Sequence, residues 1–357
     1  MNGTDEPTQE FCQSVADRLS EWYERSHRDF PWRHDRDPYR IFVSETMLQQ
    51  TQAERVRSFF VRWLDRFPTL ASLAAASEED VLQMWQGLGY YSRARSILAS
   101  AQMLISKGYS TLPADAALLE ELPGFGPYTA GAVCSIAFDM PTPAVDANVR
   151  RVFSRLLDLS LDPSKAEGRR IIENAVRTVL LCGTPHILTQ AFMELGATVC
   201  LPSCRCVDCP LDQLCRARAA GTQQSRPAGG RIVRVKRRNG AALLFRTPAG
   251  ICLRRRAARG LWADFYEIPW VIGDENETHD DCLRRLASEL GVKTSECGGC
   301  GMAETLRFTQ WQVRVRLWTC RHFCAIPQNL ELFPENSLEE LPMPAGIKRL
   351  VIKYLKS

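Results

Sequence analysis

A short glycine-rich segment in a helical setting constrains this chain more than any other feature. It runs Leu122-Pro-Gly-Phe-Gly-Pro-Tyr-Thr-Ala-Gly131, and Gly124 and Gly126 bracket a tight turn between two helical patterns. Such a hairpin turns consecutive backbone N–H groups outward at a helix N-terminus, where the helix dipole and unpaired donors attract a phosphate. Asp146 follows fifteen residues after the segment. The turn indicates nucleic-acid binding, and the alternative is an ordinary glycine-capped helix connection.

The pattern of apolar residues divides the chain into a helical part and a later mixed part. Residues 10 to about 220 show helical periodicity, and prolines followed by Thr or Asp mark the connections. Residues 216–238 contain eight Arg or Lys and no Asp or Glu, which is typical of a basic linker. Strand-like alternation then predicts a separate α+β domain. We expect helices at 10–25, 56–67, 78–86, 94–107, 118–122 and 280–290, further helices after Thr129, Asp146 and Ala166, and strands at 241–246, 250–256 and 312–319.

Composition limits the class of protein. The 357 residues suffice for two or three domains, and 45% hydrophobic with 24% charged residues fit a soluble globular protein. The net charge of +4 is too modest to indicate nucleic-acid binding by itself. No apolar run reaches the length of a membrane span, and residues 1–10 lack the pattern of a secretion signal. We therefore expect a cytoplasmic protein that does not contact membranes.

Five of the fourteen cysteines lie between residues 200 and 215, which indicates a metal site in a reducing compartment. Cys200, Cys206, Cys209 and Cys215 are separated by five, two and five residues, with Cys204 as an extra thiol. Four thiolates suit either zinc or an iron–sulfur cluster, and the spacing alone does not decide. By contrast, Cys297-Gly-Gly-Cys300 is interpreted as a glycine-rich turn with two incidental cysteines.

Together, the hairpin, the trailing Asp146 and the cysteine cluster resemble the endonuclease III superfamily of base-excision DNA glycosylases, and within it the MutY-type adenine DNA glycosylases. The resemblance covers most of 20–220 and is weaker in 233–357. The motifs that carry it are the hairpin, Pro31-Trp-Arg33, Ser44-Glu-Thr-Met-Leu-Gln-Gln-Thr51, Trp85-Gln-Gly-Leu-Gly-Tyr-Tyr-Ser-Arg93 and Val145-Asp-Ala-Asn-Val149. This resemblance implies a structural, DNA-facing 4Fe-4S cluster on the four spaced cysteines. The family usually has six residues between the first two cysteines, so Cys204 is an alternative to Cys206.

Two carboxylates fit the chemistry of cleaving a purine from deoxyribose, which needs a proton on the leaving base and negative charge near the sugar. Glu45 lies in an apolar segment, where burial would raise its pKa, while Asp146 would stay ionised beside helix N–H groups. The alternative for Glu45 is a dipole partner at a helix start. The resemblance implies that Glu45 protonates adenine N7 and that Asp146 stabilises the sugar cation and positions water, supported by Tyr128 and Asn148.

Tyr128 distinguishes between branches of the superfamily. Members that also cut the strand have a lysine there, which attacks the sugar and forms an imine. Because tyrosine cannot form that imine, we expect base removal that leaves an intact abasic strand. Read without the resemblance, Tyr128 is a packing residue at a helix start.

The remaining expectations concern DNA contacts. The target base must leave the stack, so the enzyme has to fill the gap and hold the partner base. The resemblance implies Gln49, Gln50 and Thr51 as the insertion loop, Leu88 and Tyr90 as a wedge, and Arg28, Trp32 and Gln190 around the extruded adenine. Leu88, Tyr90 and Trp32 have core packing as their alternative role.

The C-terminal part resembles a Nudix-like module that reads 8-oxoguanine. The family's Phe-Ser-His recognition loop corresponds here to Phe308, Thr309 and Gln310, so a hydroxyl is kept and an imidazole is not. A Nudix pyrophosphatase needs a helix with clustered glutamates. The nearest segment, 284–291, has Arg285 and Ser288 in two such places and keeps only Glu289. We expect binding by this domain and no hydrolysis.

We thus predict a mainly α catalytic region followed by an α+β Nudix-like domain. Residues 1–30 with 137–220 would form the iron–sulfur subdomain, 31–136 a six-helix bundle with the helix-hairpin-helix, 221–232 a basic linker, and 233–357 the Nudix-like domain. The predicted function is a monomeric, monofunctional glycosylase that removes adenine opposite 8-oxoguanine or guanine in double-stranded DNA. In a bacterium it would associate with the nucleoid. The alternatives are a thymine or uracil mismatch glycosylase, a non-catalytic damage-binding protein, and a nucleotide pyrophosphatase.

Overall fold

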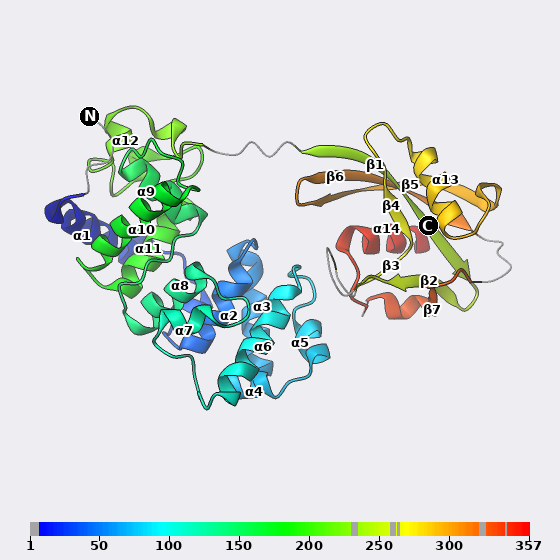
Figure 1. The fold of residues 1–357 in the computed structure, drawn as a ribbon, viewed down its shortest axis with the longest axis horizontal. Coiled ribbons are helices and arrows are strands. Elements are labelled where there is room, and N and C mark those ends of the chain that lie inside the picture. The colour runs from blue at the N-terminus through cyan, green and yellow to red at the C-terminus, as the bar shows by residue number, and fades with distance from the viewer. Residues whose placement is uncertain (1–6, 230–234, 258–261, 263–264, 321–325, 340) are drawn as a thin grey trace. The chain divides into compact units, whose positions relative to one another are not determined.

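The computed structural model describes residues 7–229, 235–257, 262, 265–320, 326–339 and 341–357. The chain forms two compact units, 1–231 and 232–357, and each is described by itself. Figure 1 shows that the first is built from helices and the second around a sheet, which confirms the predicted fold class. Within the described residues, no helix is both long and apolar enough to cross a membrane.

The first unit consists of short and medium helices joined by short connections. Its α-helices are α1 (Gln9–Ser26), α2 (Pro38–Leu48), α3 (Ala53–Arg66), α4 (Leu70–Ala74), α5 (Glu78–Met84), α6 (Ser92–Ser106), α7 (Ala116–Glu120), α8 (Pro127–Phe138), α9 (Ala147–Leu156), α10 (Ala166–Leu180), α11 (Pro185–Thr198) and α12 (Arg216–Ala219). Three 3-10 turns, η1 (Pro31–Arg33), η2 (Cys206–Asp208) and η3 (Gln223–Ser225), complete it.

Two hydrophobic cores lie side by side in this unit. One gathers apolar side chains from α2 to α8, and the other gathers those of α1 with α9, α10 and α11. The N-terminal helix α1 therefore packs against helices that come more than a hundred residues later (Figure 1). This pairing supports the subdomain limits given above, which we keep as a proposal.

The helix α8 is central to the unit because it is buried on nearly all sides and contacts both α2 and α11. The predicted hairpin turn leads into it, with Gly126 as N-cap. Gly124 has a φ of +78°, and an added Cβ would lie 2.5 Å from the Ser96 Cβ. Only glycine fits both conditions, so the turn that precedes α8 can lie directly against Ser96 of α6.

The predicted linker differs from the structure over 221–229. Arg155 donates from Nε to the carbonyl oxygens of Gln223 (2.8 Å) and Arg226 (3.3 Å), and the Arg226 Nε lies 2.8 Å from Asp158 Oδ1. This stretch is therefore packed onto the helical unit. Residues 230–232 of the predicted linker lie outside the described residues.

The second unit holds a sheet of seven strands within the part of the chain that the structure describes. Its strands are β1 (Lys236–Thr247), β2 (Gly250–Arg255), β3 (Tyr266–Glu267), β4 (Trp270–Ile272), β5 (Cys297–Phe308), β6 (Trp311–Cys320) and β7 (Glu331–Phe333). The strand order is β3-β2-β1-β6-β5, with β4 paired to β1 and β7 to β2. β1 and β6 are parallel, whereas β5 and β6 form an antiparallel hairpin.

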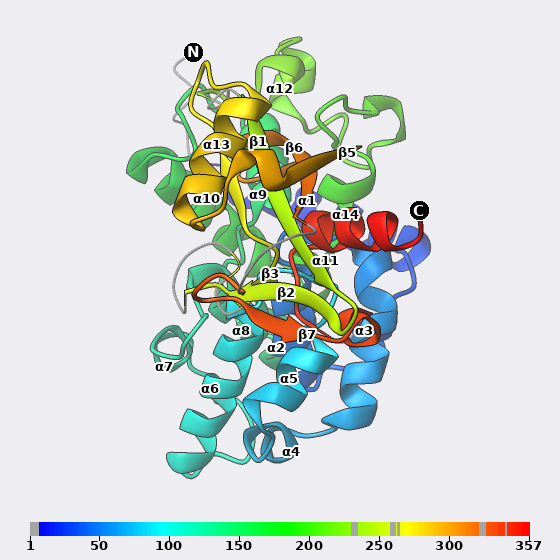
Figure 2. The ribbon, with the colours of Figure 1, turned by 90° about the vertical axis from the view of Figure 1, so that its right-hand side faces the viewer.

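Helices cover both faces of this sheet. Figure 2 shows α13 (His279–Glu289) and α14 (Ala345–Leu355) on either side of β1. Their apolar residues belong to two different cores, which the alternating side chains of β1 and β6 complete. Of two 3-10 turns, η4 (Thr294–Glu296) lies between α13 and β5, and η5 (Glu335–Glu339) lies between β7 and α14.

The interpretation of Cys297 to Cys300 as a turn is wrong, because these residues belong to β5. Cys297 pairs with Cys320 and Gly298 with Thr319, and the register shifts between Gly299 and Ala303. The glycines here mark a bulge in a strand rather than a chain reversal.

Candidate active site

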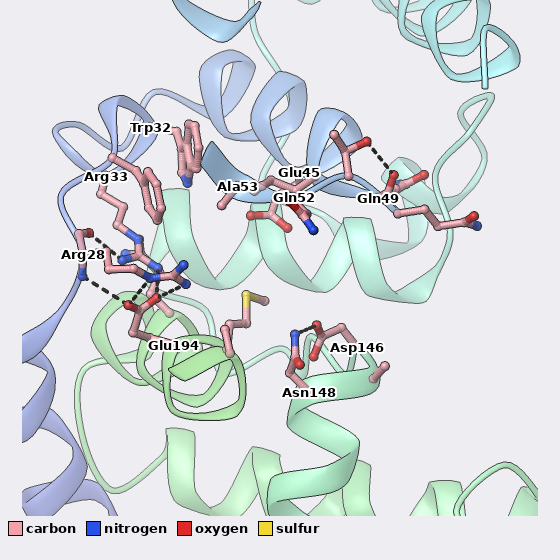
Figure 3. A pocket seen from close by; sticks show the side chains of 18 of the residues that line it. Arg28, Trp32, Arg33, Glu45, Gln49, Gln52, Ala53, Asp146, Asn148 and Glu194 are labelled. Carbon is pink, nitrogen blue, oxygen red and sulfur yellow. Dashed lines mark hydrogen bonds and ion pairs between the residues drawn. The ribbon is translucent and has the colours of Figure 1, made fainter. Parts of the chain in front are cut away.

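A cavity of about 740 Å³ in the helical unit brings together most of the predicted site residues. Its walls come from η1, from α2 and the loop after it, and from the starts of α8 and α9 together with α11 (Figure 3). The predicted residues that line it are Arg28, Trp32, Glu45, Gln49, Gln50, Thr51, Tyr128, Asp146, Asn148 and Gln190. Leu88, Tyr90, Gly124 and Gly126 do not line it.

Glu45 is a buried acid in this cavity. It lies in the last turns of α2 with only 5% of its surface exposed, so its interpretation as a dipole partner at a helix start is wrong. Burial raises the pKa of Glu45 to about 7, and the charge of Asp146 adds to the rise. The Tyr128 hydroxyl donates to Glu45 Oε2 at 2.5 Å, which opposes it. Glu45 can therefore hold a proton near neutral pH.

Asp146 is the N-cap of α9, and its carboxylate is held by two donors. Oδ1 accepts the Val149 N–H at 2.7 Å, and Oδ2 accepts Asn148 Nδ2 at 2.9 Å. Burial raises the pKa of Asp146 above its ordinary value, although these hydrogen bonds lower it in part. Asn148 is fixed in turn by Arg151, whose Nη2 donates to Asn148 Oδ1 at 2.8 Å. The carboxylate thus has a defined orientation toward the cavity.

Sequence reasoning missed Glu194, a buried carboxylate on α11 in the same cavity. Arg28 donates to both of its oxygens, at 2.7 and 3.0 Å, and Arg33 Nη2 donates at 2.8 Å (Figure 3). Burial raises the pKa of Glu194, but the two arginines prevail and hold it below its usual value. The sequence signal was a glutamate on the apolar face of α11, between Phe192 and Leu195.

An aromatic wall closes the side of the cavity next to this arginine pair. The Trp32 ring stacks on Phe30 with centroids 4.7 Å apart, and both side chains are buried in the first core. The Gln190 amide donates to the carbonyl of His186 within its own helix at 3.1 Å. A flat aromatic surface beside fixed polar groups suits a planar heterocyclic base.

Each of the two predicted DNA-contact loops presents one exposed residue, whereas Leu88 is buried. Gln50 and Tyr90 are exposed, the latter to 50%, and each has a left-handed backbone with φ of 57° and 50°. Leu88, at 7% exposure, belongs to the core. Left-handed residues other than glycine are strained, and such strain gathers at functional positions.

The five cysteines between residues 200 and 215 border one small cavity, together with Arg155. Arg155 Nη1 lies 3.4 Å from Cys200 Sγ, where its charge would offset that of a thiolate. Burial raises the pKa of Cys209 to about 12, so metal binding there must displace a proton. Within the described ranges, no three His, Cys, Asp or Glu side chains are grouped so as to hold a metal ion as they stand. The sulfur donors around one cavity still fit an iron–sulfur cluster.

In the second unit, the predicted recognition residues form the β5–β6 turn. Thr309 and Gln310 are exposed, and Thr309 is strained with a φ of 48°. Phe308 packs on Trp262, with centroids 5.0 Å apart. Glu289, the one glutamate kept from the Nudix helix pattern, forms an ion pair with Arg254, with Oε1 and Nη1 3.3 Å apart.

Each of the two units matches a known protein family. Residues 43–178 match the HhH-GPD superfamily of base excision DNA repair proteins, and residues 240–353 match the NUDIX domain. A protein of Homo sapiens named adenine DNA glycosylase is 41% identical over 224 residues, covering 60% of this chain and 41% of its own length. One of Mycobacterium tuberculosis with the same name is 40% identical over 219 residues, covering 60% of this chain and 72% of its own length. The chain belongs to the adenine DNA glycosylase family.

A solved structure resembles this chain, and the mammalian relatives are much longer than the part of them that it matches. The structure of a non-covalent endonuclease III–DNA complex is similar to this chain, with a TM-score of 0.50 and 25% sequence identity. The similarity covers 60% of this chain and 99% of that one. The chain spans about two fifths of the length of its human, mouse and rat relatives.

Proposed function

We propose that this chain is a monofunctional adenine DNA glycosylase that removes adenine paired with 8-oxoguanine, and less efficiently adenine paired with guanine, from duplex DNA. The observation that carries the proposal is the pairing in one cavity of a buried acid of raised pKa, Glu45, with a second carboxylate, Asp146. Carboxylates whose environments differ in this way can divide acid and charge-stabilising roles. Membership of the adenine DNA glycosylase family supports the choice of adenine.

The proposed reaction is hydrolysis of the bond between C1′ of the sugar and N9 of adenine. Glu45 gives its proton to adenine N7, and the bonding electrons leave with the base. The ionised Asp146 stabilises the cation that develops on the sugar. A water then adds to C1′, and its proton passes to Asp146. Asp146 afterwards releases this proton to solvent, and Glu45 takes up a proton from solvent, so both groups return to their starting states. The products are free adenine and an intact strand with an abasic sugar.

The absence of strand cutting follows from the side chain at position 128. Among the described residues that line the cavity none is a lysine, and Tyr128 holds Glu45 through its hydroxyl. An imine with the sugar requires an amine nucleophile. We infer that Tyr128 and Asn148 orient the two carboxylates and that neither attacks the sugar.

The proposed DNA contacts divide between the two units. In the helical unit, Gln49 to Thr51 would fill the gap, Leu88 and Tyr90 would act on the partner side, and the Gly124–Gly126 turn would bind a phosphate. Arg28, Trp32 and Gln190 would surround the extruded adenine. In the second unit, Phe308, Thr309 and Gln310 would read 8-oxoguanine. We further propose that the chain acts on double-stranded DNA as a monomer, in the cytoplasm and with the nucleoid if bacterial.

The cysteines would hold a 4Fe-4S cluster through Cys200, Cys206, Cys209 and Cys215. When bound, the cluster would cross-link the segment 200–215 and take no part in the hydrolysis. The chain's own Arg155 already ties this segment to α9 and to residues 223–226, since it donates to Leu201, Pro202, Gln223 and Arg226 carbonyl oxygens. These hydrogen bonds support a structural role for the cysteine-rich segment. We propose in addition that its basic neighbours Arg205 and Arg216 face DNA.

Substitution of single cysteines tests which thiol is the second ligand. The Sγ atoms of Cys204 and Cys206 lie 3.4 Å apart, so either is within reach. We expect Cys206→Ser to lose visible iron–sulfur absorption and bound iron, and Cys204→Ser to keep both. The matched pair controls for the loss of one thiol. Retention of iron in Cys206→Ser with loss in Cys204→Ser would reverse the assignment.

The proposed function is tested by single-turnover incubation with a labelled duplex that holds adenine opposite 8-oxoguanine. The products are analysed with and without alkali, which breaks the strand at an abasic site. We expect cleavage after alkali only, faster for adenine opposite 8-oxoguanine than opposite guanine, and none opposite thymine.

Other outcomes point to the alternatives. Strand cleavage without alkali would overturn the monofunctional assignment. Removal of thymine or uracil opposite guanine, with adenine untouched, would establish the mismatch glycosylase instead. Tight binding without cleavage of any substrate would leave a damage-binding protein.

A further inference from the structure

Arg93 makes more hydrogen bonds than any of the predicted site residues, although it is 91% buried and lies outside the cavity. It lies in the first turn of α6. Its Nη1 donates to the carbonyl oxygens of Thr46 (2.8 Å), Met47 (3.1 Å) and Gln49 (2.6 Å). Its Nη2 donates to Thr51 Oγ1 (3.4 Å) and to the carbonyl oxygens of Leu88 (3.4 Å) and Gly89 (3.1 Å). One guanidinium therefore holds both predicted DNA-contact loops.

The bonds fall at equivalent places in the two loops. Gln49 and Gly89 directly precede Gln50 and Tyr90, the exposed residues with left-handed backbone. Rotating either of these peptide units toward an ordinary conformation would withdraw its carbonyl oxygen from Arg93. The two strained residues are thus held by opposite ends of one planar group.

The side chain of Tyr90 is in contact with the same group. The Arg93 guanidinium carbon lies 5.5 Å from the Tyr90 ring centroid and 5.3 Å from that of Trp85. Both distances are within the range of a cation–π attraction. Trp85 Nε1 also donates to the Gly89 carbonyl at 3.0 Å, so this loop is held from two sides.

Charge neutralisation does not explain why an arginine is buried here. Within the described residues, no carboxylate forms an ion pair with Arg93, and its Nε has no hydrogen-bond partner. Burial lowers the pKa of Arg93 to about 10, so it stays charged at neutral pH. A buried charge held only by neutral acceptors opposes stability. Its forked geometry is what the two loops require.

We propose that Arg93 is a positioning residue that fixes Gln50 and Tyr90 relative to each other, so that both loops enter the duplex as one rigid wedge when the adenine leaves the stack. The proposal rests on the proposed function, since it needs a base to be extruded. Because Thr46 and Met47 directly follow Glu45, the same group also ties the wedge to the helix that carries the acid. Extrusion of the base and placement of the acid are thereby coupled.

The test uses 2-aminopurine, a fluorescent adenine analogue that brightens when it unstacks, at the target position opposite 8-oxoguanine. All proteins carry Glu45→Gln, so that the base stays attached. We expect fluorescence to rise on saturation with this parent, and most of the rise to be lost when Arg93→Met or Arg93→Lys is added. Lysine keeps the charge but cannot bridge both loops. Arg66→Met, which removes the exposed ion pair with Asp80, is the matched control and should behave as the parent.

Rates and stability complete the test. In the chain with Glu45 intact, we expect single-turnover removal of adenine to fall about 100-fold for Arg93→Met and about tenfold for Arg93→Lys. If Arg93→Lys unfolds at a temperature near that of the unmodified chain, its loss of rate does not come from misfolding. If Arg93→Met fails to fold, the result for Arg93→Lys decides the test. The positioning role would be overturned if Arg93→Lys kept both the full rise in fluorescence and the adenine-removal rate seen without this substitution. Failure of the unmodified chain to remove adenine would instead overturn the proposed function, and this proposal with it.

Discussion

Replacing Glu45 by glutamine is expected to slow adenine removal by about 1,000-fold while leaving duplex binding intact, because the amide cannot give a proton to the base. The substitution keeps the shape of the side chain and an oxygen that can accept the Tyr128 hydroxyl. The measurement is the single-turnover rate with adenine opposite 8-oxoguanine, together with the dissociation constant for the same duplex. Near-normal turnover by Glu45→Gln would show that Glu45 is not the group that protonates the base.

The pH dependence gives this prediction an internal control. Burial raises the pKa of Glu45 to about 7, so the unmodified chain should lose activity as the pH rises through that value and the acid gives up its proton. That alkaline limb should be missing from the residual activity of Glu45→Gln. Because the folded-state pKa of Glu45 exceeds its usual value, its ionisation also opposes folding above pH 7. At pH 8, Glu45→Gln should therefore unfold at the same or a higher temperature. Glu78→Gln, which removes a surface ion pair with Arg95, should leave the rate unchanged.

The sequence predicts those helices well that have one apolar face. The predicted helix at 10–25 is found as α1 (Gln9–Ser26), whose buried residues repeat at helical spacing. By contrast, α2 carries no such signal because Tyr39 and all residues from Ile41 to Met47 are buried. A helix enclosed on all sides has no polar face to reveal its period. The segment with Glu45 was therefore found from its motif and not from periodicity.

The mixed second unit shows a different limit. β5 contains Cys297-Gly-Gly-Cys300, and glycines in a strand resemble turn residues when only local sequence is considered. The pairing with β6 decides, and it depends on residues some twenty positions away. Tertiary pairing of this kind overrides local preference.

Within the candidate site, the motif residues were predictable and their partners were not. Glu45, Tyr128 and Asp146 stand in family motifs, and the structure brings them to one cavity. Glu194 meets Arg28 and Arg33 across more than 160 positions of sequence, which no local pattern encodes. Arg93 lies within a quoted motif, but its reach to the loop after α2 becomes visible only in the folded chain.

Replacing Asp146 by asparagine is expected to slow adenine removal by about 100- to 1,000-fold, because the variant cannot place a negative charge beside the cation that develops on the sugar. Asparagine is as good an N-cap as aspartate, so the Val149 N–H keeps an acceptor and α9 should keep its start. A loss of activity with unchanged thermal unfolding would therefore report the charge and not the fold.

Asp115→Asn provides the matched control, since Asp115 is also an N-cap aspartate, at the start of α7 and outside the cavity. It should leave the rate unchanged.

The acid side of the pH profile gives a second test of Asp146. Burial raises the pKa of Asp146, so the unmodified chain should lose activity as the pH falls through this raised value and the carboxylate becomes neutral. In Asp146→Asn that acid limb should vanish while the alkaline limb of Glu45 remains. If both limbs persisted in Asp146→Asn at near-normal rates, the sugar cation would have to be stabilised by another carboxylate of the cavity, and Glu194 would be the next to replace, because its two arginines keep it ionised.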